Sequence, residues 1–391
     1  MRIKLEHIAI LLILISAVSR LLMPQLLTLS LYIIIPGLFF WRTLTDSNTY
    51  KSKCVMSYTA MVVWAFIATA FADNVSMAIN GLIVIAGGFM LSIVFYSMSR
   101  NSSSNSSWLL VVWLVYFVAM IIYMNNVGLL QEIDPTEKER LNDDVVNAND
   151  IAYHIFYAVI SVVLLSWGVK ERKLNKVLCF VLMCALIYGS IELSILTASR
   201  QILIVVLPLA IFSLLYRLFD GDKKKLVFAI AVVACIAPIA ISSLEGLIED
   251  TYLMARLEGE LEEDPRTPLI QKAIEVGMQN PLLGVGPSNF QLYANGAFSH
   301  CSYTEIFACT GVLGLLLYVY MCVEFIRVQY TYYRTTKDAR FLYLVMVGIM
   351  WILYNFLYVF YMGVWLIPFF FGLLGYSENI YNQLQHKRAL Q

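Results

Sequence analysis

The chain has 391 residues, of which 60% are hydrophobic and 14% are charged, and its 27 Lys and Arg residues balance 27 Asp and Glu residues. A soluble domain is nearer half apolar and a quarter charged, so this composition is typical of an integral membrane protein. It excludes a secreted enzyme, a nucleic-acid-binding protein and a single-pass receptor.

Apolar runs long enough to cross a bilayer recur along the whole chain. The sequence predicts twelve such spans, near 7–22, 26–41, 54–71, 77–97, 108–124, 151–168, 177–197, 201–219, 226–243, 303–326, 341–360 and 364–380. The expected fold class is therefore all-α, a polytopic integral membrane protein with one large loop. We divide the chain into residues 1–243 with nine spans, the loop 244–302, and residues 303–391 with three spans and a tail.

Basic residues distinguish the two faces of the predicted bundle. When the polar breaks are assigned alternately to the two sides, most Lys and Arg residues fall on one face. That face is expected to be cytoplasmic, with both termini in the cytoplasm. The few basic residues of the outer face are Arg20, Lys138, Arg140, Arg200, Arg256, Arg266 and Lys272.

A short break between the seventh and eighth spans contains Arg200, in Leu196-Thr-Ala-Ser-Arg-Gln201. A tight hairpin there would hold a permanently charged guanidinium at the outer membrane surface. On position alone, snorkelling to lipid phosphate is the better explanation of Arg200. Glu192, two helical turns earlier, is an intramembrane carboxylate that could orient a neighbour or pack in its protonated form.

The loop 244–302 has internal order, which favours a functional role over a flexible connector. Thr267-Pro268 predicts the start of a helix and Asn280-Pro281 its end. Ile270, Ala273, Ile274 and Gly277 fall on one side of this segment. We therefore predict a short amphipathic helix at the outer membrane interface.

Two arginines accompany this helix. Arg266 precedes its first turn, where the free N–H groups and an arginine fork could bind an anion. An ion pair of Arg266 with Glu262, Glu263 or Asp264 explains it equally well. Arg256 lies in an acidic stretch, so a solvated ion pair is expected there, with at most a secondary role in substrate binding.

The end of the loop contains a glycine turn and a histidine. Leu282 to Phe290 lacks the third glycine and the preceding strand of a dinucleotide fingerprint. His300 comes shortly before the tenth span and is followed by Tyr303 and Glu305. Imidazole accepts a proton near neutral pH, and His300 would share one outer vestibule with two arginines, so we favour a functional role for it.

Further along the same span, Thr310 and Gly314 form a pair of small residues four positions apart. This spacing is typical of close helix packing in membranes.

Taken in order, these motifs resemble the O-antigen ligase and polymerase superfamily. The residues that carry the resemblance are Thr197 to Arg200, Arg266 before the amphipathic helix, Asn280 to Gly286 with Phe290, His300, Glu305 and Thr310 to Gly314. The resemblance implies a GT-C-type glycosyltransferase of the bacterial inner membrane, whose active site faces the periplasm. This context favours a functional role for Arg200.

The resemblance also implies roles for the candidate residues. Arg200 and Arg266 would hold the diphosphate of an undecaprenyl-diphosphate-linked oligosaccharide, and His300 would activate or position the acceptor hydroxyl. Tyr303, Glu305 and Arg256 would bind substrate, with no metal and no cofactor. The expected partners are membrane lipid and, by family resemblance, a chain-length regulator protein. The chain departs from its relatives at His300-Cys301, where many have His-Asn, and lacks their tryptophan near Ala273.

Three functions remain as alternatives. The leading hypothesis is an O-antigen or exopolysaccharide polymerase, which transfers a growing lipid-linked glycan onto a lipid-linked repeat unit. A ligase would use the same donor and move the glycan to lipid A core or to protein. A lipid-linked oligosaccharide flippase or another transporter is the minority hypothesis. A transporter predicts polar residues spread through the spans and inverted halves, which this sequence does not show.

Overall fold

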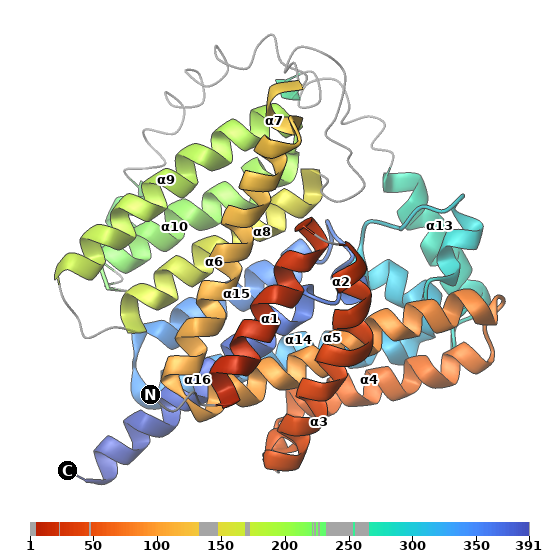
Figure 1. The fold of residues 1–391 in the computed structure, drawn as a ribbon, viewed down its shortest axis with the longest axis horizontal. Coiled ribbons are helices and arrows are strands. Elements are labelled where there is room, and N and C mark those ends of the chain that lie inside the picture. The colour runs from red at the N-terminus through yellow and green to blue at the C-terminus, as the bar shows by residue number, and fades with distance from the viewer. Residues whose placement is uncertain are drawn as a thin grey trace. The chain divides into compact units, whose positions relative to one another are not determined.

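The computed structural model describes residues 5–22, 24–46, 48–132, 148–168, 173–220, 222, 224–225, 227–231, 253–254 and 266–390 (Figure 1). These residues form helices and turns, with no β-strand among them. The helices are α1 (Leu5–Leu22), α2 (Pro24–Leu29), α3 (Ile35–Thr45), α4 (Lys53–Ala70), α5 (Val75–Asn101), α6 (Ser103–Asn126), α7 (Leu129–Glu132), α8 (Ala148–Gly168), α9 (Lys173–Thr197), α10 (Leu207–Leu218), α13 (Arg266–Gln279), α14 (Ser302–Thr336), α15 (Ala339–Tyr354) and α16 (Leu366–Ala389). Short 3-10 turns are η2 (Thr49–Lys51), η4 (Asn289–Tyr293) and η5 (Phe360–Met362).

Each predicted span overlaps one or more of these helices, apart from 226–243, which lies mostly outside the described residues. Six described helices are long and apolar enough to cross a membrane: α4, α5, α6, α8, α9 and α14. Shorter apolar helices lie at Leu5–Val18, Ser30–Thr45, Ile202–Leu218 and Ala339–Tyr354. The all-α prediction is therefore confirmed, whereas the total of twelve crossings stays a prediction.

Two of the predicted spans contain a π-helical turn directly before a proline. The π segment η1 (Ser30–Ile34) precedes Pro36, and η3 (Ile202–Val206) precedes Pro208. A proline inside a helix has no N–H to donate, and its ring crowds the carbonyl four residues earlier. The wider π turn accommodates that ring, so both helices continue through the proline.

The chain forms two compact units, which we describe separately. The first unit comprises Met1–Ala17, Gln25–Leu109 and Pro265–Gln391, and the second comprises Val18–Pro24 and Leu110–Asp264. In the first unit, α5 packs against α3, α4 and α16, and α14 packs against α4, α13 and α15. In the second unit, α8, α9 and α10 pack against one another. The sequence division at residues 243 and 302 stays a prediction.

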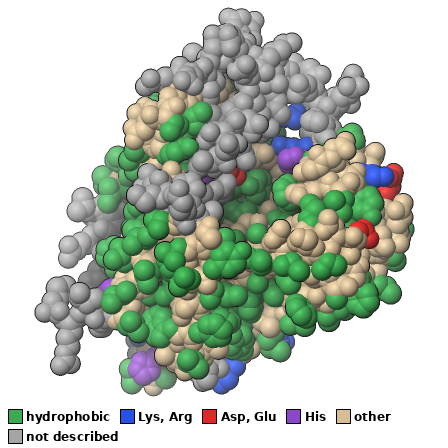
Figure 2. Space-filling model, turned by 45° about the vertical axis from the view of Figure 1, so that its right-hand side comes forward, with side chains coloured by type: hydrophobic (Ala, Val, Ile, Leu, Met, Phe, Trp, Pro, Cys, Tyr) green, Lys and Arg blue, Asp and Glu red, His purple; other side chains and the backbone are tan. Residues whose placement is uncertain are grey.

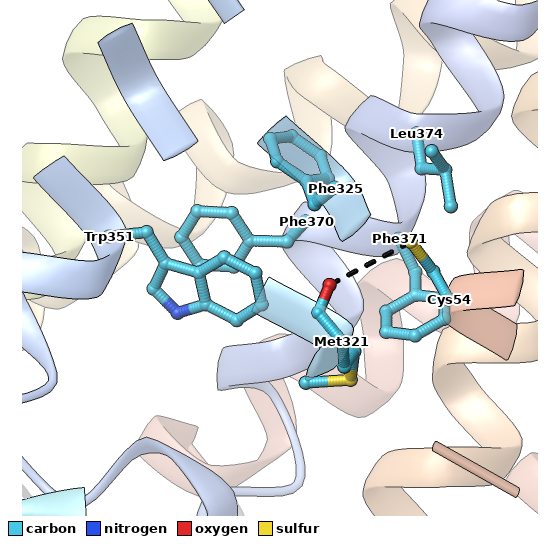
Figure 3. Close-up of a pocket in the computed structure, with 7 residues that line it drawn as sticks. All are labelled: Cys54, Met321, Phe325, Trp351, Phe370, Phe371 and Leu374. Atoms are coloured by element: carbon cyan, nitrogen blue, oxygen red, sulfur yellow. Dashed lines mark hydrogen bonds between the residues drawn. The ribbon is translucent and has the colours of Figure 1, made fainter. Parts of the chain in front are cut away.

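Aromatic side chains fill the centre of the first unit. The Trp351 and Phe370 rings stack with centroids 3.8 Å apart. With Cys54, Met321, Phe325, Phe371 and Leu374 they surround a cavity of about 10 Å³, in which the Cys54 thiol donates to the Met321 carbonyl (Figure 3). A cavity of that size holds at most about one water molecule. The cavity is a small gap in the packing between α4, α14, α15 and α16, and it has no room for a sugar.

Charged groups tie helices of the first unit together near residues 42–46 and 97–101. The Arg42 guanidinium donates to Ser97 Oγ at 2.7 Å, and Ser97 Oγ donates to Asp46 Oδ2 at 2.7 Å. Arg100 pairs with Glu378 of α16 at 2.9 Å. Buried charges require such partners, and these contacts join α3, α5 and α16.

Hydrophobic side chains cover most of the described surface in Figure 2, and charged ones are confined to a few places. Among the exposed large side chains are Phe40, Phe66, Val181 and Leu316. An apolar surface of this extent is typical of contact with lipid rather than with water.

Candidate active site

The segment that contains most of the candidate residues folds as a small cap on the first unit. We define the cap as residues 266–310: α13, the glycine turn, η4, the turn at His300 and the first part of α14. Its core consists of Ala273, Val276, Val285, Phe290, Ala294, Ala308 and Cys309. The cap is therefore a packed structure rather than an unstructured loop.

The predicted amphipathic helix is present as α13, which extends over Arg266–Gln279. Its buried face consists of Ala273, Val276 and Gly277, whereas Ile274 is exposed. Val276 therefore packs into the core of the cap beside Ala273 and Gly277, and the predicted contact of this helix with the membrane interface stays a prediction. A Cβ at Gly277 would lie 2.4 Å from the Phe307 ring, so α13 approaches α14 closely at this point.

The glycine turn inserts into a break in α14. Gly311 has φ 69° and ψ −171°, which interrupts the helix. The Val285 and Gly286 N–H groups donate to the Ala308 and Cys309 carbonyls at 2.9 and 3.0 Å. Helical partners for these carbonyls are lost at the break, so the loop supplies replacements.

Backbone also fills the space around the break. The Val312 N–H donates to the Pro281 carbonyl at 2.8 Å, and Trp64 of α4 donates to the Thr310 carbonyl at 2.8 Å. A Cβ at Gly284, where φ is 67°, would lie 2.4 Å from the Cys309 carbonyl carbon. The spacing of Thr310 and Gly314 predicts ordinary helix packing. It does not predict that α14 breaks at Gly311, which lies between them.

His300 occupies a strained position in the turn before α14. Its φ of 58° is unusual for a residue with a side chain, and the side chain is half-buried. Both neighbours of His300 are fastened: Ser299 Oγ donates to the Cys301 carbonyl at 2.9 Å, and the Glu305 N–H donates to the same carbonyl at 3.0 Å. The turn is thus bound to the first turn of α14.

Glu305 lies inside the cap and is fully buried. Its Oε2 accepts a hydrogen bond from the Ser299 N–H at 2.6 Å. Oε1 has no hydrogen-bond partner among the described residues. The carboxylate is thus enclosed by described residues, and its predicted contact with substrate stays a prediction.

Tyr303 fastens α14 to α15, and Ser302 fastens α14 to the chain that follows α15. The Tyr303 hydroxyl donates to the Ile352 carbonyl at 2.8 Å. Ser302 Oγ donates to the Tyr358 carbonyl at 2.7 Å and accepts from the Phe360 N–H at 2.9 Å. The predicted span 341–360 is shorter than expected, since α15 ends at Tyr354 and this connection begins there.

A Ser302→Ala variant is expected to lose about 2 kcal/mol of stability, because the half-buried Tyr358 carbonyl and the buried Phe360 N–H lose their partner. The measurement is the midpoint of thermal unfolding of the purified protein in detergent. Ser107→Ala is the control, since the Ser107 hydroxyl donates only to the Ser103 carbonyl of its own helix. Equal midpoints for the two variants would contradict the assignment of Ser302 as a fastening residue.

The arginines lie at the starts of helices. Arg266 is the first residue of α13 and is half-buried. Arg200 is half-buried and starts the helix that continues into η3, after a hairpin in which Ala198 has φ 48°. The predicted hairpin is therefore present, in the second unit. Arg256 and the predicted ion-pair partners of Arg266 lie outside the described residues.

Sequence reasoning missed the contribution of the connection between α4 and α5. Tyr293 of η4 donates a hydrogen bond to Asp73, which raises the pKa of the Tyr293 hydroxyl. The Asp73 N–H donates to the Val285 carbonyl at 3.2 Å. Nothing in the spacing signals this contact, since the partners are more than 200 residues apart.

The glycine turn borders an open groove of about 340 Å³, lined by Phe71 and residues 279–284. Its position at the cap is compatible with contact to lipid or substrate, but no candidate site residue lines it.

Long apolar helices, an apolar surface and a folded cap define the chain as an all-α polytopic membrane protein. Residues 192–319 match a family model described as O-antigen ligase. The matched segment includes Arg200 and the whole cap, and the match supports a relation to the O-antigen ligase and polymerase superfamily without separating ligase from polymerase. A search of curated proteins found no match to the chain.

Proposed function

We propose that the protein is a polysaccharide polymerase, which transfers a lipid-diphosphate-linked glycan onto a lipid-linked repeat unit at the periplasmic face of the inner membrane. The observation that carries this proposal is the match over residues 192–319, which runs from before Arg200 to beyond Gly314. Within this segment, two arginines stand at helix starts and a histidine stands in a strained turn.

The proposed chemistry is the displacement of a lipid diphosphate. His300 accepts the proton of the acceptor hydroxyl, whose oxygen attacks the anomeric carbon of the donor glycan. The bond from that carbon to the diphosphate oxygen breaks, and lipid diphosphate leaves. Arg200 and Arg266 stabilise the negative charge on the leaving group, the latter beside the N–H groups at the start of α13. In this proposal, the arginines replace a metal ion.

Arg200→Lys and Arg266→Lys are each expected to reduce glycan transfer about 10-fold or more, because lysine cannot form the bidentate contact of a guanidinium with phosphate. The measurement is the rate of chain extension by purified protein on a lipid-linked repeat unit. Lys272→Arg serves as the control, since Lys272 pairs with Glu275 on an exposed face of α13. Wild-type rates in both lysine variants would contradict diphosphate binding by these arginines.

A ligase is the second candidate, because the matching family is described as O-antigen ligase and the match does not separate the two functions. A deletion strain separates the two functions. Loss of a polymerase leaves single repeat units on the final acceptor, whereas loss of a ligase leaves long chains on the lipid carrier. If the deletion strain showed neither pattern, both proposals would be contradicted, and the transporter hypothesis would be tested next.

A further inference from the structure

The turn that presents His300 is held by a side chain from the helix that follows it. The Glu305 carboxylate reaches back six residues to the Ser299 N–H, which lies immediately before His300. Thr304 Oγ1 adds a contact to Ser299 Oγ at 3.2 Å. Residues 299–305 thus form a closed loop of hydrogen bonds in which His300 is flanked on both sides by fastened residues.

The burial of Glu305 is expensive for the fold. A buried carboxylate needs partners for both oxygens, and only Oε2 has one among the described residues. Among the described residues, the Glu305 carboxylate acts electrostatically on Cys309 of the same helix and on Tyr361 of η5. Neither carries a compensating positive charge. A glutamate at this position therefore does not stabilise the fold, and its presence needs another explanation.

The positive φ of His300 gives a second reason to connect the two residues. A side-chain-bearing residue in this conformation is strained and persists only where its surroundings enforce it. The Glu305 to Ser299 hydrogen bond enforces it on the N-terminal side, and the Cys301 carbonyl, which accepts from the Glu305 N–H, does so on the C-terminal side.

We infer that Glu305 is a positioning residue, which fixes the direction of the His300 side chain by holding the Ser299 N–H, and that it does not itself contact substrate. This inference rests on the proposed function of His300. It changes the role that the sequence suggested for Glu305, from binding substrate to orienting the residue that handles the acceptor.

Two variants of the full-length protein in lipid nanodiscs test the inference. Glu305→Gln keeps an oxygen acceptor for the Ser299 N–H, whereas Glu305→Met has a similar length and no acceptor. Glu324→Met is the matched control, because Glu324 is a buried glutamate further along α14 that pairs with Arg327. The readouts are hydrogen exchange at the Ser299 amide and the separate kcat and KM for glycan transfer.

Glu305→Met is expected to raise the exchange rate at Ser299 at least 10-fold and to lower kcat by about 10-fold to 100-fold with KM changed less than about 2-fold. Glu305→Gln is expected to retain the slow exchange and to restore most of kcat. Unchanged exchange in Glu305→Met would overturn the inference, as would fast exchange with an unchanged kcat.

The exchange measurement separates this inference from the proposed function. If His300→Ala were fully active, the proposed function would fail, while the exchange rates in the Glu305 variants would still report whether Glu305 holds the turn. If His300→Ala were inactive and Glu305→Met exchanged like the wild type, only the positioning role would be overturned.

Discussion

His300→Ala is expected to insert into the membrane at the wild-type level and to form no polymer, with glycan transfer reduced at least about 100-fold. The reason is that, in the proposed mechanism, the imidazole accepts the proton of the acceptor hydroxyl. The cap should stay folded, because the hydrogen bonds of Ser299 with Glu305 and with Cys301 remain to hold the turn. The measurement is the chain-length distribution of surface glycan in a complemented deletion strain.

His386→Ala is the matched control for this experiment. His386 is an exposed residue near the end of α16, in the basic last turn of that helix. Its replacement should leave the distribution of chain lengths unchanged. A wild-type distribution in His300→Ala would refute the site assignment, whatever the behaviour of the control.

Gly311→Ala is expected to destabilise the cap by about 3 kcal/mol or more. The backbone conformation at Gly311, with φ 69° and ψ −171°, is almost exclusive to glycine. A Cβ there would lie 2.1 Å from the Leu282 carbonyl oxygen, and backbone cannot move aside as a flexible side chain can. The measurement is thermal unfolding of the purified protein, together with proteolysis of the cap.

Gly189→Ala is the control, because it also adds a Cβ to a glycine but in an open environment. Gly189 lies in α9, and a Cβ added there meets nothing within 4 Å. The variant should be as stable as the wild type, or slightly more stable, because alanine favours helix. If Gly311→Ala unfolded at the same temperature as Gly189→Ala, the break in α14 would not require glycine.

The helices were predictable because a bilayer demands long apolar runs, and composition reports these directly. Proline and capping signals also placed the start and end of α13 within two residues. Helix interruptions were harder to predict. The span 303–326 reads as a continuous apolar helix, and only the contacts of Gly311 with Leu282 show that it is broken.

The candidate residues were predictable as a set of chemical types, but their surroundings were not. Charge against the topological trend singled out Arg200 and Arg266. Nothing in the sequence distinguished Glu305, which is enclosed, from a carboxylate that faces an aqueous vestibule. Burial depends on contacts between distant parts of the chain, which local patterns do not report.

The insertion of the glycine turn into broken α14 has a consequence for biosynthesis. The backbone partners of this turn are Asp73, made early, and residues from Ala308 to Val312, made after the turn itself. During synthesis, the residues of the turn are made before the Ala308 and Cys309 carbonyls that accept their hydrogen bonds. The cap therefore matures only after residues 308–312 have been added, so a truncated product that stops before Ala308 contains His300 and Glu305 but leaves the glycine turn without its acceptors.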